Sequence, residues 1–339
     1  MEKVAVVILN WNGKNFLEQF LPQVIKYSAK DAEIIVADNA STDESLAFLR
    51  KTYPEIRLII NPFNGGFSKG YNDSLSQIEA KYYILLNSDV EVTPGWINPI
   101  IDLMDNDKSI AACQPKILSF HEREKFEYAG AAGGFIDKFG YPFCRGRLFQ
   151  SIEKDHGQYD DSVEVFWATG ACMFVRAEYF HQLGGLDNDF FAHMEEIDLC
   201  WRMKRRGYKI VFCPSSVVYH VGGGTLPKKS AFKTYLNIRN NLIMLYKNLP
   251  ANRLFIVLFL RFFLDLIAAF KFLVDGGLND FKAVFKAYIS FYSTISRHKG
   301  KRKLQSHTKV SGIYRGSIVF SHYLFRRKKF SQLNPSRFE

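Results

Sequence analysis

The chain has 339 residues, enough for one large α/β domain with an appended region. Its composition is globular, with 47% hydrophobic and 23% charged residues and neither a low-complexity tract nor an internal repeat. The five cysteines are scattered and form no Cys-x-x-Cys pair, which argues against a disulfide framework or a zinc site and favours a reducing compartment. Because the N-terminal sequence also lacks signal-peptide character, we expect a cytoplasmic location.

The formal charge of +11 is distributed unevenly along the chain. Residues 251–339 contain 17 Lys/Arg and 4 Asp/Glu, whereas residues 1–250 contain 28 Lys/Arg and 30 Asp/Glu. A near-neutral body with a strongly basic C-terminal part predicts an anionic partner for that part. Nucleic acid is one candidate anion, but the sequence has no nucleic-acid recognition motif, so we expect no such partner.

Short apolar strands alternate with helical segments through the first 250 residues. We expect strands at residues 4–9, 33–37, 57–60, 82–86, 110–117, 163–167, 171–176 and 209–213. Helices are expected at residues 14–27, 44–52, 68–78, 95–105, 195–206 and 233–248. Apolar strands separated by helices predict an α/β fold with a parallel sheet covered on both faces. Residues 118–163 are irregular and Gly-rich, and we interpret them as a loop excursion that carries substrate contacts.

Residues 253–275 form a long apolar run interrupted by charges. On a helix the charged side chains share one arc of about 120°: Arg253, Arg261, Asp265, Lys271 and Asp275. So many charges argue against a transmembrane span and favour an interfacial helix in the headgroup plane. A helix packed on its own protein or in a homo-oligomer is the alternative. Basic clusters at residues 297–303 and 326–329 favour an anionic membrane surface.

Polar clusters follow four of the expected strands. They occupy residues 10–13, 38–43, 61–72 and 87–89. Ligands of open α/β sheets bind at the carboxyl ends of parallel strands. The sequence therefore predicts a ligand site along this edge of the sheet.

An acidic cluster opens the expected helix at residues 195–206 and consists of Glu195, Glu196 and Asp198. Clustered acids repel one another and are unfavourable to bury, so they need a cation, a substrate hydroxyl or solvent. A solvated first helical turn is the alternative, because the helix macrodipole favours acids there. Flanking apolar residues favour a pocket: Phe190, Phe191, Leu199 and Trp201.

Together these motifs resemble the family 2 glycosyltransferases, which have the GT-A fold. The matching segments, all within residues 3–225, are residues 8–12, 38–43, 64–67, 87–89 and the block 170–198. The pattern is most similar to the rhamnosyltransferase-like branch, which builds bacterial surface polysaccharides. The resemblance implies a Rossmann-like, mostly parallel sheet flanked by helices. We expect residues 1–225 to be the catalytic domain and residues 226–339 to be a helical, basic, amphipathic region.

For the donor, the resemblance implies a site for a UDP- or dTDP-sugar at the strand ends. Asp38 would accept the N3–H of a uracil or thymine ring, or alternatively be a capping or turn residue before the following helix. Gly65 and Gly66 would let the backbone approach the nucleotide, with a plain turn as the alternative. The other nucleotide-binding candidates from these motifs are Asn10, Asn39, Asn64 and Asn87.

For the metal, Asp89 corresponds to the last residue of the family's Asp-x-Asp motif. That motif binds a divalent cation, Mg²⁺ or Mn²⁺, which bridges the two phosphates. Asn87 replaces the first Asp and removes a charge, which leaves metal dependence open. His220 matches a His that completes the metal site in some relatives, and a structural histidine is the alternative.

For catalysis, the resemblance makes Glu196 the base that deprotonates the acceptor hydroxyl in an inverting single displacement. Glu195 or Asp198 could take this role, because a Glu reaches about one methylene further than the family's usual Asp. Asp187 and Trp167 are candidates for lining the sugar or acceptor pocket, or for structural roles. We expect the acceptor to be a glycan or lipid-linked glycan at the cytoplasmic face of the cell membrane.

Three other classes of protein compete with this interpretation. A dinucleotide-dependent oxidoreductase would need a G-x-G-x-x-G turn, whereas the first strand runs into Asn10-Trp11-Asn12-Gly13. A sugar-nucleotide nucleotidyltransferase would share much of the sheet but release pyrophosphate. A non-catalytic membrane scaffold would need neither Asp89 nor Glu196.

Overall fold

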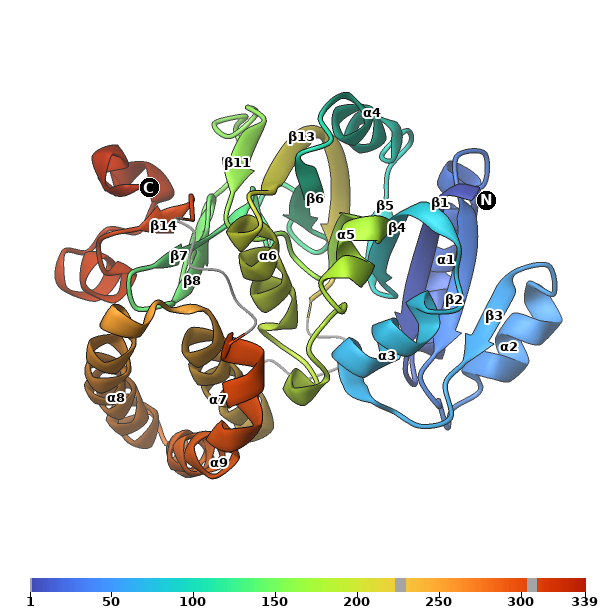
Figure 1. Ribbon diagram of the computed structural model, residues 1–339. Helices are drawn as coiled ribbons and strands as arrows, with labels where there is room; N and C mark the ends of the chain where they lie inside the picture. The colour runs from blue at the N-terminus through green and yellow to red at the C-terminus, as the bar shows by residue number, and fades with distance from the viewer. Residues whose placement is uncertain (1, 223–229, 304–309) are drawn as a thin grey trace.

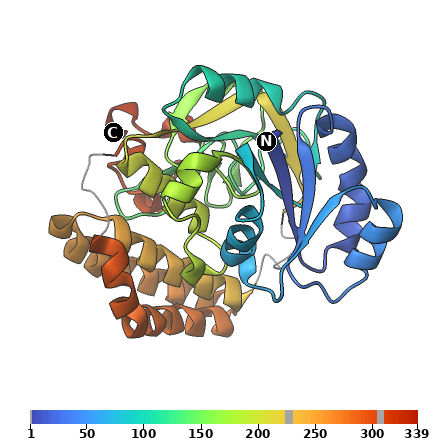
Figure 2. The ribbon, with the colours of Figure 1, turned by 45° about the vertical axis from the view of Figure 1, so that its right-hand side comes forward.

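The computed structural model describes residues 2–222, 230–303 and 310–339. A central sheet is flanked by helices, and three long helices stand as a group at one side of it (Figures 1 and 2). The predicted α/β class with a helical, basic C-terminal part is confirmed. The expected division between residues 225 and 226 lies outside the described residues and stays a prediction.

The first four expected strands form the parallel part of the sheet in the order β3-β2-β1-β4. Their bounds are β1 Glu2–Asn10, β2 Glu33–Asp38, β3 Arg57–Ile60 and β4 Ala80–Asn87. Asn10 lies opposite Asp38, and Leu9 lies opposite Asn87, so the polar strand ends share one edge. The intervening helices are α1 Lys14–Ser28, α2 Ser45–Thr52 and α3 Gly66–Leu75.

The other half of the sheet is mixed in direction. Its strands are β5 Val90–Val92, β6 Ile110–Ser119, β11 Val163–Val165, β12 Cys172–Arg176 and β13 Lys209–His220. β12 is antiparallel to both β4 and β6, whereas β13 runs parallel to β6. β5 and β11 pair antiparallel with β13, which brings the segment after β4 beside the end of β13.

Both faces of the sheet are buried. Along β1, Ala5 and Val7 enter one hydrophobic cluster, while Val4 and Val6 enter the other. The remaining helices are α4 Asn98–Asn106, α5 Ala177–Gln182, α6 Glu195–Arg205, α7 Ala231–Asn248, α8 Ala251–Val274 and α9 Leu278–Lys303. Short helical turns are η1 Asn188–Phe190, η2 Phe320–Leu324, η3 Phe330–Gln332 and η4 Pro335–Arg337.

The interpretation of residues 118–163 as a loop is wrong in part, because they contribute four strands to a second sheet. Its order is β10-β9-β8-β7-β14. The strands are β7 Gly134–Asp137, β8 Pro142–Cys144, β9 Arg147–Leu148, β10 Ser151–Ile152 and β14 Ile313–Tyr314. Strands of two to four residues are too short to show a period of two in the sequence. β14 joins this sheet from the C-terminal part and runs parallel to β7.

Helix α8 orients its charges differently from the expectation. Arg261 and Asp265 are buried, at 2% and 3% exposure, instead of facing solvent. Arg261 Nη2 lies 3.2 Å from both carboxylate oxygens of Asp265, and Arg261 Nη1 donates to the Phe139 carbonyl at 3.0 Å. Asp265 also accepts hydrogen bonds from the hydroxyls of Tyr141 and Tyr288. Two members of the charged arc, Arg261 and Asp265, therefore anchor α8 to the body of the protein.

Within residues 2–222, 230–303 and 310–339, no helix combines the length and the apolar content needed to cross a membrane.

Breaking the buried ion pair of α8 should reduce stability more than breaking an exposed ion pair with the same spacing of four residues. Asp265→Asn leaves the buried Arg261 guanidinium without its counter-charge and should lower the free energy of unfolding by about 3–5 kcal/mol. Asp275→Asn removes the partner of the exposed Lys271 and should change it far less. Urea denaturation of both variants measures the difference, and equal destabilisation would contradict the anchoring role of Asp265.

Candidate functional site

Asn10 and Asp38 meet at the carboxyl ends of β1 and β2. Asn10 Nδ2 donates to Asp38 Oδ1 and to Ser41 Oγ, both at 3.1 Å. Asp38 Oδ2 accepts the Ser41 backbone N–H at 2.9 Å, and the Asp38 side chain is fully buried. Asp38 thus holds the turn after β2, the alternative role that the sequence left open. Its contact with a nucleotide base stays a prediction.

Asn39, Asn64 and Gly66 form a second cluster beside this turn. Asn39 Nδ2 donates to Asn64 Oδ1 at 2.9 Å and to the Gly66 carbonyl at 3.0 Å. Gly66 has φ +74°, and a Cβ there would lie 2.3 Å from the carbonyl oxygen of Phe191. Gly65 precedes α3 with an ordinary φ of −83°. Gly66 therefore permits close approach of the chain's own segment at Phe191, and its approach to a nucleotide remains untested.

Asp89 and His220 come together where β4 and β13 end. His220 Nε2 lies 3.1 Å from Asp89 Oδ1, and His220 Nδ1 lies 3.2 Å from Glu127 Oε2. All three side chains are buried. Asn87, the last residue of β4, donates its backbone N–H to the Ala171 carbonyl at 3.0 Å. The structure thus places the two predicted metal ligands in contact and adds Glu127 behind the imidazole.

Electrostatics keep this triad charged. Burial lowers the pKa of His220, but the negative charges of Glu127 and Asp89 outweigh it and raise that pKa to about 10. Burial opposes ionisation of Asp89 as well, yet the hydrogen bond and charge of His220 lower the pKa of this carboxyl. Glu127 behaves in the same way, and its pKa is lowered by the charge of His220.

Asp89 and His220 provide only part of the ligands that a hard divalent cation needs. Within the described part of the chain, no group of three or more His, Cys, Asp or Glu side chains could enclose a metal ion. Asp89 and His220 offer one oxygen and one nitrogen that lie side by side, and a cation that keeps oxygen ligands from a diphosphate and water needs few protein groups. The residues therefore fit a cation that is shared with a bound diphosphate.

Glu195 and Glu196 begin α6 and point two carboxylates into a buried environment. One oxygen of each, Oε2, has no hydrogen-bond partner among the described residues. Burial raises the pKa of both carboxyls, and the charge of Glu196 raises that of Glu195 further. Buried carboxyl groups with raised pKa values are suited to proton transfer.

Asp198, the other candidate for the base, is placed differently. Its carboxylate accepts hydrogen bonds from Arg202, Lys247 and Asn248, each at 2.8 Å, and it is fully buried. Although burial opposes ionisation, the charges of Lys247 and Arg202 lower the pKa of Asp198. With its oxygens held by three donors, Asp198 is a structural anion, and this geometry argues against it as the base.

Sequence comparison assigns the family. The sequence model of glycosyl transferase family 2 matches residues 5–184, more than half of the chain. The chain belongs to this family. An N-acetylglucosaminyl-diphospho-decaprenol L-rhamnosyltransferase of Mycobacterium tuberculosis is 26% identical over 232 residues, 64% of this chain and 75% of that protein. A low-salt glycan biosynthesis hexosyltransferase of Haloferax volcanii is 24% identical over 251 residues, 72% of this chain and 75% of that protein.

Solved structures show that this glycosyltransferase has the GT-A fold. A crystal structure of GalNAc-T7 with UDP, GalNAc and Mn²⁺ matches with a TM-score of 0.56 and 18% identity, over 73% of this chain. The matched part spans 48% of the GalNAc-T7 chain, about half of its length. A mannosyltransferase of Pyrobaculum calidifontis with GDP-Man and Mn²⁺ matches with a TM-score of 0.50 and 13% identity, over 89% of this chain and 82% of that one.

In the glycosyltransferase, the segment before α6 is conformationally strained. Phe191, His193 and Met194 all have positive φ, which is unfavourable for residues with a side chain. The Phe191 carbonyl accepts the backbone N–H of Phe67 at 2.6 Å, one of the N–H groups at the start of α3 that lack a partner within the helix. The strained segment leads directly into Glu195 and so sets the direction of both glutamates.

Asn240 of α7 holds the same segment from the other side. Its Nδ2 lies 2.8–2.9 Å from the carbonyl oxygens of Phe190, Ala192 and His193. Arg239 Nη2 donates to the Phe190 carbonyl at 3.2 Å. Asn240 was not among the sequence candidates, because a buried Asn within a helical segment carries no motif. Its position reveals that α7 belongs to the site.

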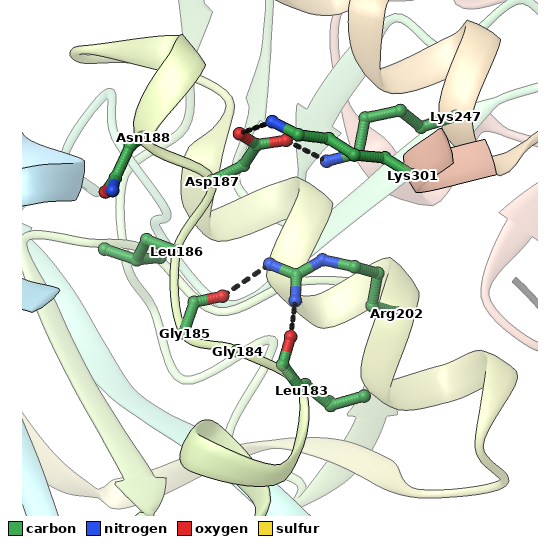
Figure 3. Close-up of a pocket in the computed structure, with 9 residues that line it drawn as sticks. All are labelled: Leu183, Gly184, Gly185, Leu186, Asp187, Asn188, Arg202, Lys247 and Lys301. Atoms are coloured by element: carbon green, nitrogen blue, oxygen red, sulfur yellow. Dashed lines mark hydrogen bonds and ion pairs between the residues drawn. The ribbon is translucent and has the colours of Figure 1, made fainter. Parts of the chain in front are cut away.

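A pocket of about 310 Å³ lies beside α6 and is lined by residues 183–188, Arg202, Lys247 and Lys301 (Figure 3). Its cations are already paired, because Lys247 and Lys301 both contact Asp187 and Arg202 donates to the carbonyls of Leu183 and Gly185. Although burial opposes ionisation, the two lysines hold the pKa of Asp187 well below its usual range. Asp187 therefore ties the body to α7 and α9.

Trp167 has a structural position as well. Its side chain is buried, and its Nε1 donates to the Phe135 carbonyl at 3.0 Å. The ring fills the space beside Gly134, where a Cβ would lie 2.1 Å from it. This packing joins the main sheet to the second sheet.

We expect Asn240→Ala to affect both stability and catalysis. Loss of the amide removes the donor from the partly buried carbonyl oxygens of Ala192 and His193, so the free energy of unfolding should fall by about 1–3 kcal/mol. The strained segment should then relax and misplace Glu196, so sugar transfer should fall by more than the loss of folded protein explains. Urea denaturation and turnover measure the two effects, with Asn252→Ala on exposed α8 as the control. Unchanged stability would show that Asn240 does not hold the segment.

Proposed function

We propose that this glycosyltransferase is an inverting enzyme. It transfers a sugar from a UDP- or dTDP-sugar to a glycan or lipid-linked glycan acceptor in cell-surface polysaccharide synthesis. The supporting observation is the pair of buried carboxylates at the start of α6, which have raised pKa values and unpartnered oxygens. The relative from Mycobacterium tuberculosis is named for a diphospho-decaprenol acceptor, which supports a lipid-linked acceptor here.

In the proposed mechanism Glu196 is the base. It takes the proton from the acceptor hydroxyl while the acceptor oxygen attacks the anomeric carbon and the bond to the diphosphate breaks. Glu195, whose pKa is raised further, stays protonated beside it and adds no second negative charge. Such a base contributes about 10²–10⁴-fold to the rate. No covalent intermediate is needed, because a single displacement inverts the anomeric centre.

We propose Asp89 and His220 as protein ligands of a Mg²⁺ or Mn²⁺ ion. A cation bound there would neutralise the charge that develops on the leaving diphosphate. Both structures named above contain Mn²⁺, which supports a divalent cation in this fold. To act as a ligand, His220 must release its Nε2 proton, and Glu127 on the other ring nitrogen keeps the imidazole oriented.

We further propose a catalytic domain at residues 1–225 and a peripheral membrane position for the basic region at residues 226–339. The protein would act at the cytoplasmic face, where a lipid-linked acceptor presents its sugars. The charge of residues 251–339 supports attraction to an anionic surface.

A panel of nucleotide sugars tests the proposal directly. The purified protein is incubated with each UDP-, dTDP- and GDP-sugar, with and without Mn²⁺, and release of the nucleoside diphosphate is measured. Turnover of a UDP- or dTDP-sugar is the expected result. Release of pyrophosphate from a nucleoside triphosphate would instead identify a nucleotidyltransferase, and no turnover with any donor would favour a scaffold.

Glu196→Gln should reduce transfer by about 10²–10⁴-fold and leave donor binding intact, because the amide cannot accept the proton. The pKa of Glu196 is raised to about 7, so transfer by the unmodified protein should fall as the pH drops below 7 and the carboxylate becomes protonated. Acceptor-dependent pH profiles and donor titrations measure both effects. Glu195→Gln is the matched variant, and loss of transfer there alone would make Glu195 the base.

Glu127→Gln should weaken Mn²⁺ binding by about 10–100-fold, because the neutral amide no longer orients and polarises His220. Calorimetric titration of Mn²⁺ in the presence of UDP measures the affinity without any need for turnover. The control variant is Glu122→Gln, which changes an exposed acid that also lies within residues 118–163. Unchanged Mn²⁺ affinity in Glu127→Gln would remove Glu127 from the metal site.

A further inference from the structure

Helix α8 exposes an extended apolar surface. Its inward stripe consists of Val257, Arg261, Asp265 and Ala269, spaced four residues apart. Both charged residues between positions 254 and 270 belong to this buried stripe, so no charged side chain is exposed there. The outward side chains include Phe255 at 79% exposure, Ile267 at 67%, Phe270 at 54% and Phe259 at 50%. At 1.5 Å per residue this apolar surface extends for about 25 Å.

A second exposed apolar segment lies in the C-terminal part. Phe320, Tyr323, Leu324 and Phe325 are between 46% and 67% exposed. Tyr323 interacts electrostatically with Lys271 of α8, which places this segment near the end of the α8 surface. Four basic residues, 326–329, follow it directly. We call α8 residues 255–274 together with residues 320–329 the apolar-basic surface.

We infer that the apolar-basic surface binds an anionic lipid bilayer, with the α8 aromatic and aliphatic side chains in the headgroup region. Monomeric soluble proteins rarely expose a continuous apolar surface of this kind without a partner. An interfacial helix contributes apolar burial, and neighbouring Lys and Arg residues add attraction to anionic lipid. The apolar-basic surface supplies both, because residues 326–329 add four basic side chains next to its apolar side chains.

The charge also argues against a second copy of the chain as the binding partner of the apolar-basic surface. A symmetric dimer would bring the same surface of two copies together. Each copy would then bring its own excess of basic residues, and like charges in contact oppose association. A negatively charged bilayer meets the same surface with the opposite sign.

Binding through this surface deepens the proposed function, on which it rests for the lipid-linked acceptor. α8 is anchored to the second sheet through Arg261 and Phe139, and α7 holds the segment before Glu195. The helices at the membrane are thus joined rigidly to the catalytic residues. A lipid-linked sugar could then reach the site while its lipid stays in the bilayer.

Co-sedimentation of the full chain with vesicles tests the inference. Vesicles of phosphatidylcholine with 30% phosphatidylglycerol are compared with vesicles of phosphatidylcholine alone. The double variant Phe255→Glu/Phe259→Glu should bind the anionic vesicles at least tenfold more weakly, while Ile60→Glu, at 48% exposure on the distant strand β3, should bind like the unmodified chain. Equal binding by the double variant and the unmodified chain would overturn the inference.

Charge reversal provides the second test. Lys328→Glu/Lys329→Glu should weaken binding to the anionic vesicles by at least tenfold, whereas Lys30→Glu/Lys51→Glu, in the turn after α1 and on α2, should not. A stable dimer in sedimentation velocity that fails to bind either vesicle would overturn the inference in favour of a second copy. Donor turnover without vesicles reports on the proposed function separately. Loss of turnover with intact vesicle binding would refute the proposed function alone.

Discussion

The contacts from the Asn240 amide to the carbonyl oxygens of Phe190, Ala192 and His193 determine the conformation of the segment that leads into α6. The segment at Phe190–Met194 contains three residues with positive φ, and strain of about 1–3 kcal/mol at each must be offset by contacts elsewhere. Asn240 supplies them from α7, and the start of α3 supplies them through the Phe191 carbonyl. Without both contacts the backbone strain would not be offset, and the segment would lose the conformation that directs Glu195 and Glu196 inward.

This arrangement changes the role of the C-terminal helices. α7 reaches the acidic cluster through Asn240, Lys247 and Asn248, which lie on one side of the helix at a spacing of seven and eight residues. Asp187 and Asp198 depend on Lys247 for charge compensation. The segment around α6 and the C-terminal helices therefore share one network of ion pairs. It neutralises Asp187 and Asp198, whereas Glu195 and Glu196 each keep one oxygen without a hydrogen-bond partner among the described residues.

The sequence predicted the features that depend on local patterns. Buried strands and polar strand ends have a clear composition, so the sheet could be anticipated, whereas a shared site for Asp89 and His220 was implied by the family resemblance. Glu127 and Asn240 could not, because neither belongs to a motif and their partners are distant in the chain: Glu127 contacts His220, 93 residues away, and Asn240 contacts Phe190, 50 residues away. The expectation that the charged side chains of α8 face solvent was wrong for Arg261 and Asp265. An amphipathic pattern identifies two faces of a helix but does not say which one the protein covers.

The pairing of β14 with β7 has a consequence for biosynthesis. Ile313 lies opposite Ile136, so the second sheet is completed by a strand that is synthesised long after its neighbour. Until the ribosome has made that segment, the outer backbone groups of β7 lack their partner, and an unpaired strand edge is a template for association with other chains. Slow translation of the helical region would thus prolong the time during which nascent molecules can aggregate.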